Sequence, residues 1–356
     1  MKKLFVAALL AVSGAVFAQT ETAPYKPGVT EEGAVYFLPK TSLRITLLVE
    51  KTTYKPGMFA KYAERYLRLM DVEQKETVKH KVINIGMKSY GEADKSKAYT
   101  VKFNAKTSAT NVVLAEDGTL LAINTDPYKI QPTTEFVAAQ KPAKTDPRKY
   151  MKEEILAAQG LEKMAELTAS DIYEIRESKN LLTRGQADFM PKDGAQLQIM
   201  LNDLNAQDKA LTQLFTGTIE KDTTEHVIEL TPDKNYGKQI LFRLSQKLGF
   251  VDKDDLSGTP YYLSIEDLKS LPEYTPVPDN KKKGDVTYGI FVNVPGRIQA
   301  TIFKGNQMMG RFDLSAAQFG FTEFLSGDLF NKRYTTKLVL SPYTGAILRL
   351  EAEMPM

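Results

Sequence analysis

Apolar and polar residues alternate near the start of the chain in the pattern of β-strands. Every second residue between 43 and 49 is apolar, as expected for a strand with one buried face. Over residues 58–70 the apolar positions change to helical spacing, and strand-like runs then return and end in a hairpin around Glu116-Asp117-Gly118. Residues 34–126 therefore predict an N-terminal β-rich domain, in which one helix packs on a sheet.

The middle of the chain has the pattern of a linker followed by helices. Residues 127–146 are polar and interrupted by prolines, which predicts an extended linker. Residues 147–217 have apolar positions at helical spacing and predict a helical segment that contains an antiparallel pair. Thr168 with Asp171 resembles a capping box at the start of the first long helix, and Asp193 is the expected N-cap of the second.

Asp208 interrupts the apolar stripe of the second long helix, one turn after Leu204. One interpretation is a boundary position that reaches solvent. The other is a polar contact with Arg176 or Arg184 on the preceding helix. The spacing alone leaves both interpretations open.

The last part of the chain returns to strand-like patterns. Residues 218–356 contain many short apolar runs separated by glycine or proline, and no internal repeat is visible. This predicts a C-terminal β-rich domain, either an antiparallel β-sandwich or a barrel. The expected fold class is α+β and mostly β, with the antiparallel helical pair in the centre.

The composition excludes several kinds of chemistry. The chain contains no cysteine, so it has no disulfide and no thiolate that could act as a nucleophile or a soft metal ligand. Lysine and arginine number 47 against 44 acidic residues, a net charge of +3, which is not the basic excess of a dedicated nucleic-acid binder. The densest basic run, Lys281-Lys282-Lys283, is flanked by proline and glycine and is interpreted as a solvated loop. We expect no nucleic-acid partner.

The N-terminus has the organisation of a secretory signal peptide. Residues 1–18 combine two lysines, a short apolar run and small residues before the expected cleavage between Ala18 and Gln19. Residues 19–33 are polar and predict a flexible leader. Since no cysteine follows the signal and no second apolar run reaches about 18 residues, we expect an exported protein that is not a lipoprotein and has no transmembrane segment in its mature chain.

Several segments spread over the chain carry a family resemblance. They are Gly33–Thr41, Tyr54–Gly57, Ile172–Arg176, Leu214–Gly217, Ile240–Ser245, Ala317–Gly320 and Thr344–Ile347. Together they resemble an uncharacterised family of exported Bacteroidota cell-envelope proteins, known only as a domain of unknown function. The resemblance implies a periplasmic or outer-envelope location in a Gram-negative cell and implies no reaction.

The two histidines do not form a recognisable catalytic or metal site. His80 and His226 each lie in a strand-like run, with no nucleophile elbow in the sequence and no second histidine at ligand spacing. We interpret both as packed or locally hydrogen-bonded strand residues. No phosphate-binding glycine motif occurs, and no cofactor is expected.

Two other segments superficially resemble ligand sites. Residues 252–258 are acidic, but their spacing does not match a calcium-binding loop, so a turn between strands is expected. Tyr261-Tyr262 with Tyr288 could form a sugar-stacking platform, although aromatic residues in strands usually pack in the core. Asp222-Thr223-Thr224 matches an O-glycosylation pattern of envelope proteins that the chain resembles, which makes Thr223 a candidate site; the alternative is an ordinary polar turn.

Two classes of function remain open. The first is a non-enzymatic exported binding or assembly module of the cell envelope, with an envelope protein or a glycan as its partner. The second is a carboxylate-dependent enzyme that acts on glycans or peptides. An apolar patch on the helical pair would favour the first, and a pocket with two facing carboxylates would favour the second.

Overall fold

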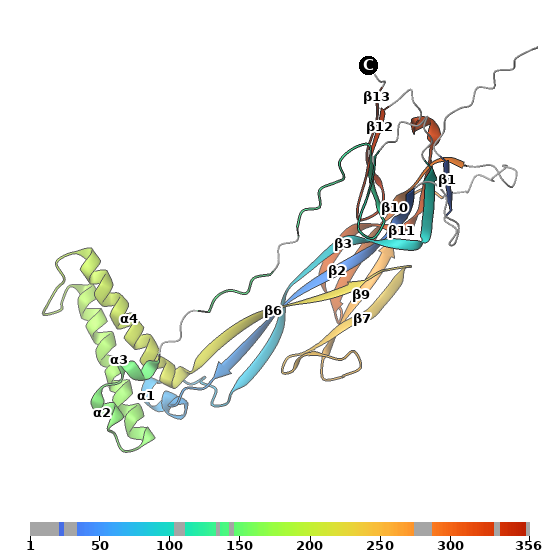
Figure 1. The fold of residues 1–356 in the computed structure, drawn as a ribbon. Helices are drawn as coiled ribbons and strands as arrows, with labels where there is room; N and C mark the ends of the chain where they lie inside the picture. The colour runs from blue at the N-terminus through green and yellow to red at the C-terminus, as the bar shows by residue number, and fades with distance from the viewer. Residues whose placement is uncertain are drawn as a thin grey trace, which may run out of the picture.

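The computed structural model describes residues 21–24, 34–102, 111–132, 136–141, 146–273, 287–330 and 335–353. The protein is elongated, with helices at one end, long strands in the middle and a small sheet near the C-terminus (Figure 1). The expected cleavage site at Ala18 and Gln19 and the basic run 281–283 lie outside the described residues.

Strands account for most of the regular structure in the described residues. They are β1 (Glu21–Pro24), β2 (Ala34–Lys55), β3 (Thr77–Lys102), β4 (Val112–Leu114), β5 (Leu120–Ile123), β6 (Thr218–Leu230), β7 (Tyr236–Ser245), β8 (Gly249–Val251), β9 (Thr259–Asp267), β10 (Thr287–Lys304), β11 (Gln307–Ser326), β12 (Thr335–Leu340) and β13 (Ile347–Glu353). The helices are α1 (Ala63–Leu67), α2 (Glu153–Leu156), α3 (Leu161–Arg184) and α4 (Gly194–Thr216). Short 3₁₀ turns precede α1 and α2 and follow β11.

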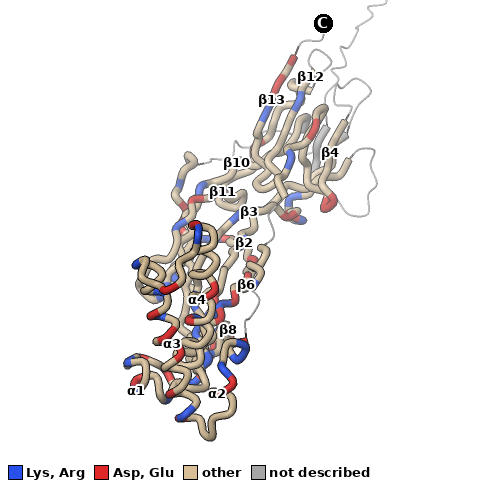
Figure 2. The backbone as a smooth tube through the Cα atoms, turned by 90° about the vertical axis from the view of Figure 1, so that its left-hand side faces the viewer, with Lys and Arg blue, Asp and Glu red and all other residues tan. Residues whose placement is uncertain are grey.

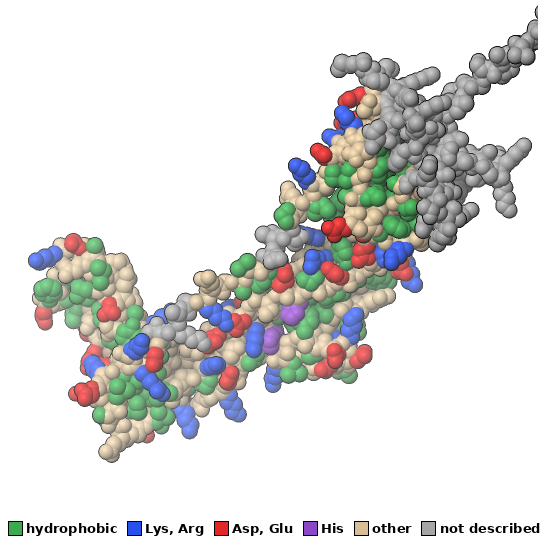
Figure 3. All heavy atoms as spheres, viewed as in Figure 1, with side chains coloured by type: hydrophobic (Ala, Val, Ile, Leu, Met, Phe, Trp, Pro, Cys, Tyr) green, Lys and Arg blue, Asp and Glu red, His purple; other side chains and the backbone are tan. Residues whose placement is uncertain are grey.

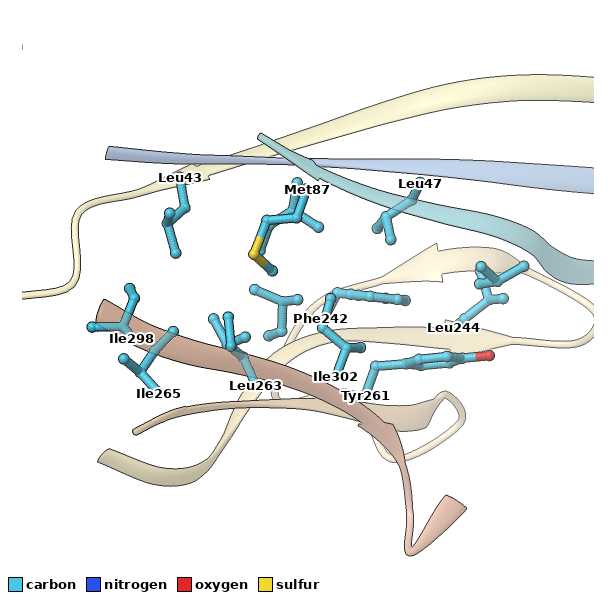
Figure 4. Packing of buried hydrophobic residues seen from close by; sticks show 14 of the residues in the cluster. Leu43, Leu47, Met87, Phe242, Leu244, Tyr261, Leu263, Ile265, Ile298 and Ile302 are labelled. Carbon is cyan, nitrogen blue, oxygen red and sulfur yellow. The ribbon is translucent and has the colours of Figure 1, made fainter. Parts of the chain in front are cut away.

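Two antiparallel layers form the central β-sandwich. One layer has the order β6-β2-β3 and the other β11-β10-β9-β7-β8, while β1 pairs with both β3 and β10 and so joins the layers at one edge. Leu43 and Leu47 of β2 face Phe242, Leu263 and Ile302 of the opposite layer in a shared apolar core (Figure 4). Because the described strands leave open edges at β6 and β8, they form no closed barrel, and the α+β, mostly β fold class is confirmed. The sandwich is not confined to residues 218–356 as predicted, since one of its layers contains β2 and β3.

Strand β6 brings the second half of the chain back onto the first. It pairs with β2 along its whole length, from Thr218 opposite Lys55 to Leu230 opposite Leu43. The structure thereby corrects the predicted division into β-rich domains 34–126 and 218–356, because strands from both segments share one core. Hydrophobic periodicity showed that these strands have a buried face, but it did not show against which partner that face is buried.

The small sheet at the other end also combines distant parts of the chain. Its order is β13-β12-β5-β4, and β5 pairs antiparallel with both β4 and β12. Its core includes Leu120 of β5 and Leu338 of β12, which pack with Tyr36 of β2 and Ile290 of β10. The hairpin predicted around Glu116-Asp117-Gly118 is confirmed as the β4–β5 connection.

The helices pack together at the end of the β2–β6 pair. Phe59, just before α1, lies 5.2 Å from Phe215 of α4 between ring centroids, and Leu67 and Ile172 belong to the same buried cluster. Helix α1 therefore packs with α3 and α4. It ends at Arg68, whose φ of 57° is left-handed.

The predicted capping box is wrong. Thr168 and Asp171 are both buried within α3 rather than at its start. The Thr168 hydroxyl donates to the carbonyl oxygen of Met164 at 2.8 Å, and the Asp171 carboxylate forms an ion pair with Lys152 just before α2. The Thr168 hydrogen bond lies within α3, and the Asp171 ion pair connects α3 to the start of α2. The buried face of α3 already begins before Thr168, so the helix starts earlier than the capping-box pattern indicated.

Charged residues of both signs are interspersed along the strands and helices (Figure 2). In the described part of the chain, no helix has the length and apolar character needed to span a membrane. An extended connection, over the described residues 126–132 and 136–141, runs between the small sheet and the helical end and contains no regular secondary structure there.

Candidate functional site

The distal half of the α3–α4 hairpin has almost no buried core of its own. Beyond Ile172, the only buried residue of α3 is Leu182, and the buried residues of α4 begin at Ala210. The two helices are antiparallel, as predicted, and their far ends project away from the sandwich (Figure 1). We call residues 173–209 the helical arm.

Local signals set the geometry of the arm. α3 ends at Gly185, whose left-handed φ of 69° suits a residue without a Cβ. The carboxylate of Asp193 accepts a hydrogen bond from the Gln196 amide at 2.7 Å and caps α4, as predicted. Between these two helix ends, residues 186–193 form the loop at the tip of the arm.

A polar cluster joins the two helices of the arm. The Asp208 carboxylate accepts hydrogen bonds from Arg176 Nε at 3.2 Å and Lys179 Nζ at 3.1 Å, and Thr212 donates to it at 3.1 Å. Burial raises the pKa of Asp208, but the hydrogen bond from Lys179 and the positive charge of Arg176 outweigh burial and lower it overall. Of the two interpretations of Asp208, the polar contact is confirmed, with Arg176 as its partner.

Large apolar side chains are exposed at the tip. The exposed fraction is 67% for Phe189 and 69% for Ile199, and Met190 is exposed beside them. Phe189 also lines a shallow groove of about 360 Å³, together with Leu181 and Met200. Figure 3 shows apolar side chains gathered at the end of the arm. Exposed apolar side chains on a projecting element are typical of a protein interaction site.

Sequence reasoning identified the helical pair but not the tip residues. Phe189 and Met190 lie in the loop, where no helical or strand period applies, and Ile199 lies off the apolar stripe of α4. The available signal was their apolar character within a polar connection.

The histidines are packed and hydrogen-bonded strand residues, as predicted. His80 Nδ1 lies 3.2 Å from the carbonyl oxygen of Gln246. His226 packs against Phe250 in a tilted arrangement with 4.2 Å between ring centroids, and burial lowers the pKa of His226 below its ordinary value. In the described residues no three histidine or carboxylate side chains are grouped closely enough to hold a metal ion.

The other candidate motifs have structural roles. Residues 252–258 form the turn between β8 and β9, confirming the expected strand connection; Ser257 N donates to the Asp255 carboxylate at 2.8 Å. Tyr261 is 3% exposed and stacks on Phe242 at 4.4 Å, so it belongs to the core and not to a sugar-stacking platform. The Tyr288 side chain lies outside the described residues.

Thr223 lies in the middle of β6, opposite Glu50 of β2, and is half-buried. The structure places it in an edge strand rather than in a turn. Its neighbour Asp222 forms an ion pair with Lys141 of the extended connection. O-glycosylation of Thr223 stays a prediction, which mass analysis of the native peptide would test.

The fold and the arm define an elongated, mostly β protein with a projecting helical hairpin. The chain belongs to the family described as Domain of unknown function (DUF4831), which matches residues 32–348. No curated protein and no solved structure matches the chain. The family match confirms the resemblance to a family of unknown function.

Proposed function

We propose that the protein is a non-enzymatic exported binding or assembly module of a Gram-negative cell envelope, of the kind found in Bacteroidota, and that its helical arm binds an envelope protein. The observation that carries this proposal is the apolar patch of Phe189, Met190 and Ile199 at the tip of the arm. Export is supported by the signal-peptide pattern of residues 1–18.

The energetics of the tip favour a partner. Fully burying a large apolar side chain contributes about 1.5–3 kcal/mol, so covering Phe189 and Ile199 would supply a substantial part of a binding free energy. The arm has few buried residues and the Asp208 cluster joins its helices, so we expect the exposed tip residues to contribute little to stability. An exposed side chain that contributes little to the stability of the fold can take part in binding without destabilising the protein.

The test compares serine substitutions of exposed apolar residues on the arm with the same kind of substitution elsewhere on the surface. Phe189→Ser with Ile199→Ser should abolish co-purification of the envelope partner from the native host and leave the melting temperature unchanged. Leu256→Ser is the matched control, because Leu256 is 84% exposed in the β8–β9 turn, far along the chain from the arm. Equal recovery of the partner with all three substitutions would refute the role of the arm.

Processing is tested separately. Intact mass of the exported protein should correspond to a chain that begins at Gln19 and carries no lipid. A retained signal segment or a lipid adduct would contradict export as a soluble protein. Hydrolysis of a glycan or peptide by the purified protein, lost when one carboxylate is changed to its amide, would establish the enzymatic alternative instead.

A further inference from the structure

A groove of the described surface lies at the other end of the sandwich from the arm. It has a volume of about 860 Å³, within the range of about 300–1,000 Å³ that is usual for small-ligand sites. Its walls come from β2, β3, the β4–β5 hairpin, the end of β6, the connection 128–131 and the β12–β13 turn.

Interactions between these segments hold the walls in place. The Asp117 carboxylate accepts hydrogen bonds from the Ala93 and Thr119 amides, each at 3.0 Å, and so fixes the β4–β5 hairpin against β3. At Gly91 a Cβ atom would overlap the carbonyl oxygen of Pro342, so only glycine allows the β12–β13 turn to approach β3 this closely. The groove walls are therefore held in place before a ligand binds, which reduces the conformational entropy that the protein would lose on binding.

Three tyrosines line the groove. Tyr128 is 48% exposed, and Tyr90 and Tyr343 are half-buried. Burial and the neighbouring carboxylates Glu92 and Glu229 raise the pKa of Tyr90, so its hydroxyl stays protonated and can both donate and accept hydrogen bonds. Flat rings with polar tips suit a ligand that has apolar faces and a hydroxyl-rich edge.

The polar groups of the groove are of mixed sign. Arg44 and Glu229 form an ion pair at 3.4 Å, and Lys88 and Glu116 also line the walls. This balance does not favour a polyanionic or polycationic ligand, because each sign is opposed by the other within the groove. It supplies donors and acceptors that can pair with the hydroxyl groups of a neutral ligand.

Thr119 lines the groove, but its side chain lies beneath the surface. It is 3% exposed, and its hydroxyl is the one buried side-chain polar atom in the described residues without a hydrogen-bond partner.

We infer that this groove is a binding site for a neutral oligosaccharide, whose sugar rings stack on the tyrosines and whose hydroxyls pair with the charged side chains. Two of the groove carboxylates already have partners, because Asp117 is engaged by two backbone amides and Glu229 by Arg44. The inference does not depend on the arm.

The experiment titrates the purified protein with a panel of neutral oligosaccharides built from hexoses, pentoses and N-acetylhexosamines, by isothermal calorimetry. At least one should bind, and Tyr128→Ala should weaken that binding about tenfold, the loss expected for one stacked ring. Tyr173→Ala is the matched control, since Tyr173 is also 48% exposed but lies on the arm. Lys88→Ala tests the polar wall and should also weaken binding.

Three results would overturn the inference. The first is an absence of binding by every oligosaccharide at millimolar concentration. The second is binding that survives both Tyr128→Ala and Lys88→Ala. The third is binding of extended peptides alone, which would assign the groove to a different class of ligand. Loss of partner binding by the arm variants would leave saccharide binding intact, so the two proposals fail independently.

Discussion

Arg176 of α3 and Asp208 of α4 form an ion pair across the helical arm, with 3.2 Å between Nε and Oδ1. Lys179 reaches the other carboxylate oxygen at 3.1 Å, so two cations on α3 hold one carboxylate on α4. This part of the hairpin has little buried apolar surface, and the polar cluster therefore carries an unusual share of the contact between its helices.

Asp208→Asn should destabilise the protein by about 1 kcal/mol at neutral pH, since partly exposed charge pairs contribute at most about this much. The folded pKa of Asp208 is below its ordinary value of 3.8, so its contribution is complete above the unfolded pKa and is lost as pH falls through the folded pKa. Urea unfolding followed by helical circular dichroism, repeated from pH 7 down to about pH 3, should show the variant and wild type converging in acid. Asp203→Asn on the same helix is the control, and a constant difference at every pH would contradict the role of the charge.

Gly91→Ala should destabilise the protein by roughly 1–3 kcal/mol, because the added methyl group would overlap the backbone of Pro342. Gly86 lies in the same strand, and a Cβ there would meet its nearest atom, Thr46 Cβ, at 4.0 Å. Gly86→Ala should therefore change the free energy of unfolding by no more than about 0.5 kcal/mol. Thermal unfolding of both variants measures the difference, and equal effects would show that the turn moves freely away from β3.

Asn293→Ala should cost about 2–4 kcal/mol, because it leaves two buried carbonyl groups without a donor. The Asn293 amide donates to the carbonyl oxygens of Pro39 and Thr344, both at 2.9 Å, and the residue is 1% exposed. Asn202→Ala on the exposed surface of α4 removes an amide of the same kind and should stay within about 0.5 kcal/mol of wild type. Chemical unfolding of the two variants gives the comparison. A small effect at Asn293 would mean that water replaces its two hydrogen bonds.

Individual elements were predictable where the signal is local. The cap at Asp193, the left-handed end at Gly185 and the β4–β5 hairpin depend on residues within a few positions of one another. The same reasoning failed at Thr168 and Asp171, where tertiary burial took two cap-type side chains into the interior of α3.

The candidate sites depended much more on tertiary structure. Sequence identified the helical pair, but the exposure of Phe189 and Ile199 depends on which surfaces the rest of the chain leaves uncovered. The groove was not predictable, since Tyr90, Tyr128 and Tyr343 come from three separate segments that meet only in the folded protein.

The sequence by itself determined the kinds of element and the mostly β, α+β class, because alternation, helical spacing and caps are properties of neighbouring residues. Only the tertiary structure decided that β6 pairs with β2, and that strands from both halves of the chain share one core. A strand pattern indicates that one face must be buried, but it does not specify the partner. The partner is selected by the burial and the backbone pairing of the whole chain.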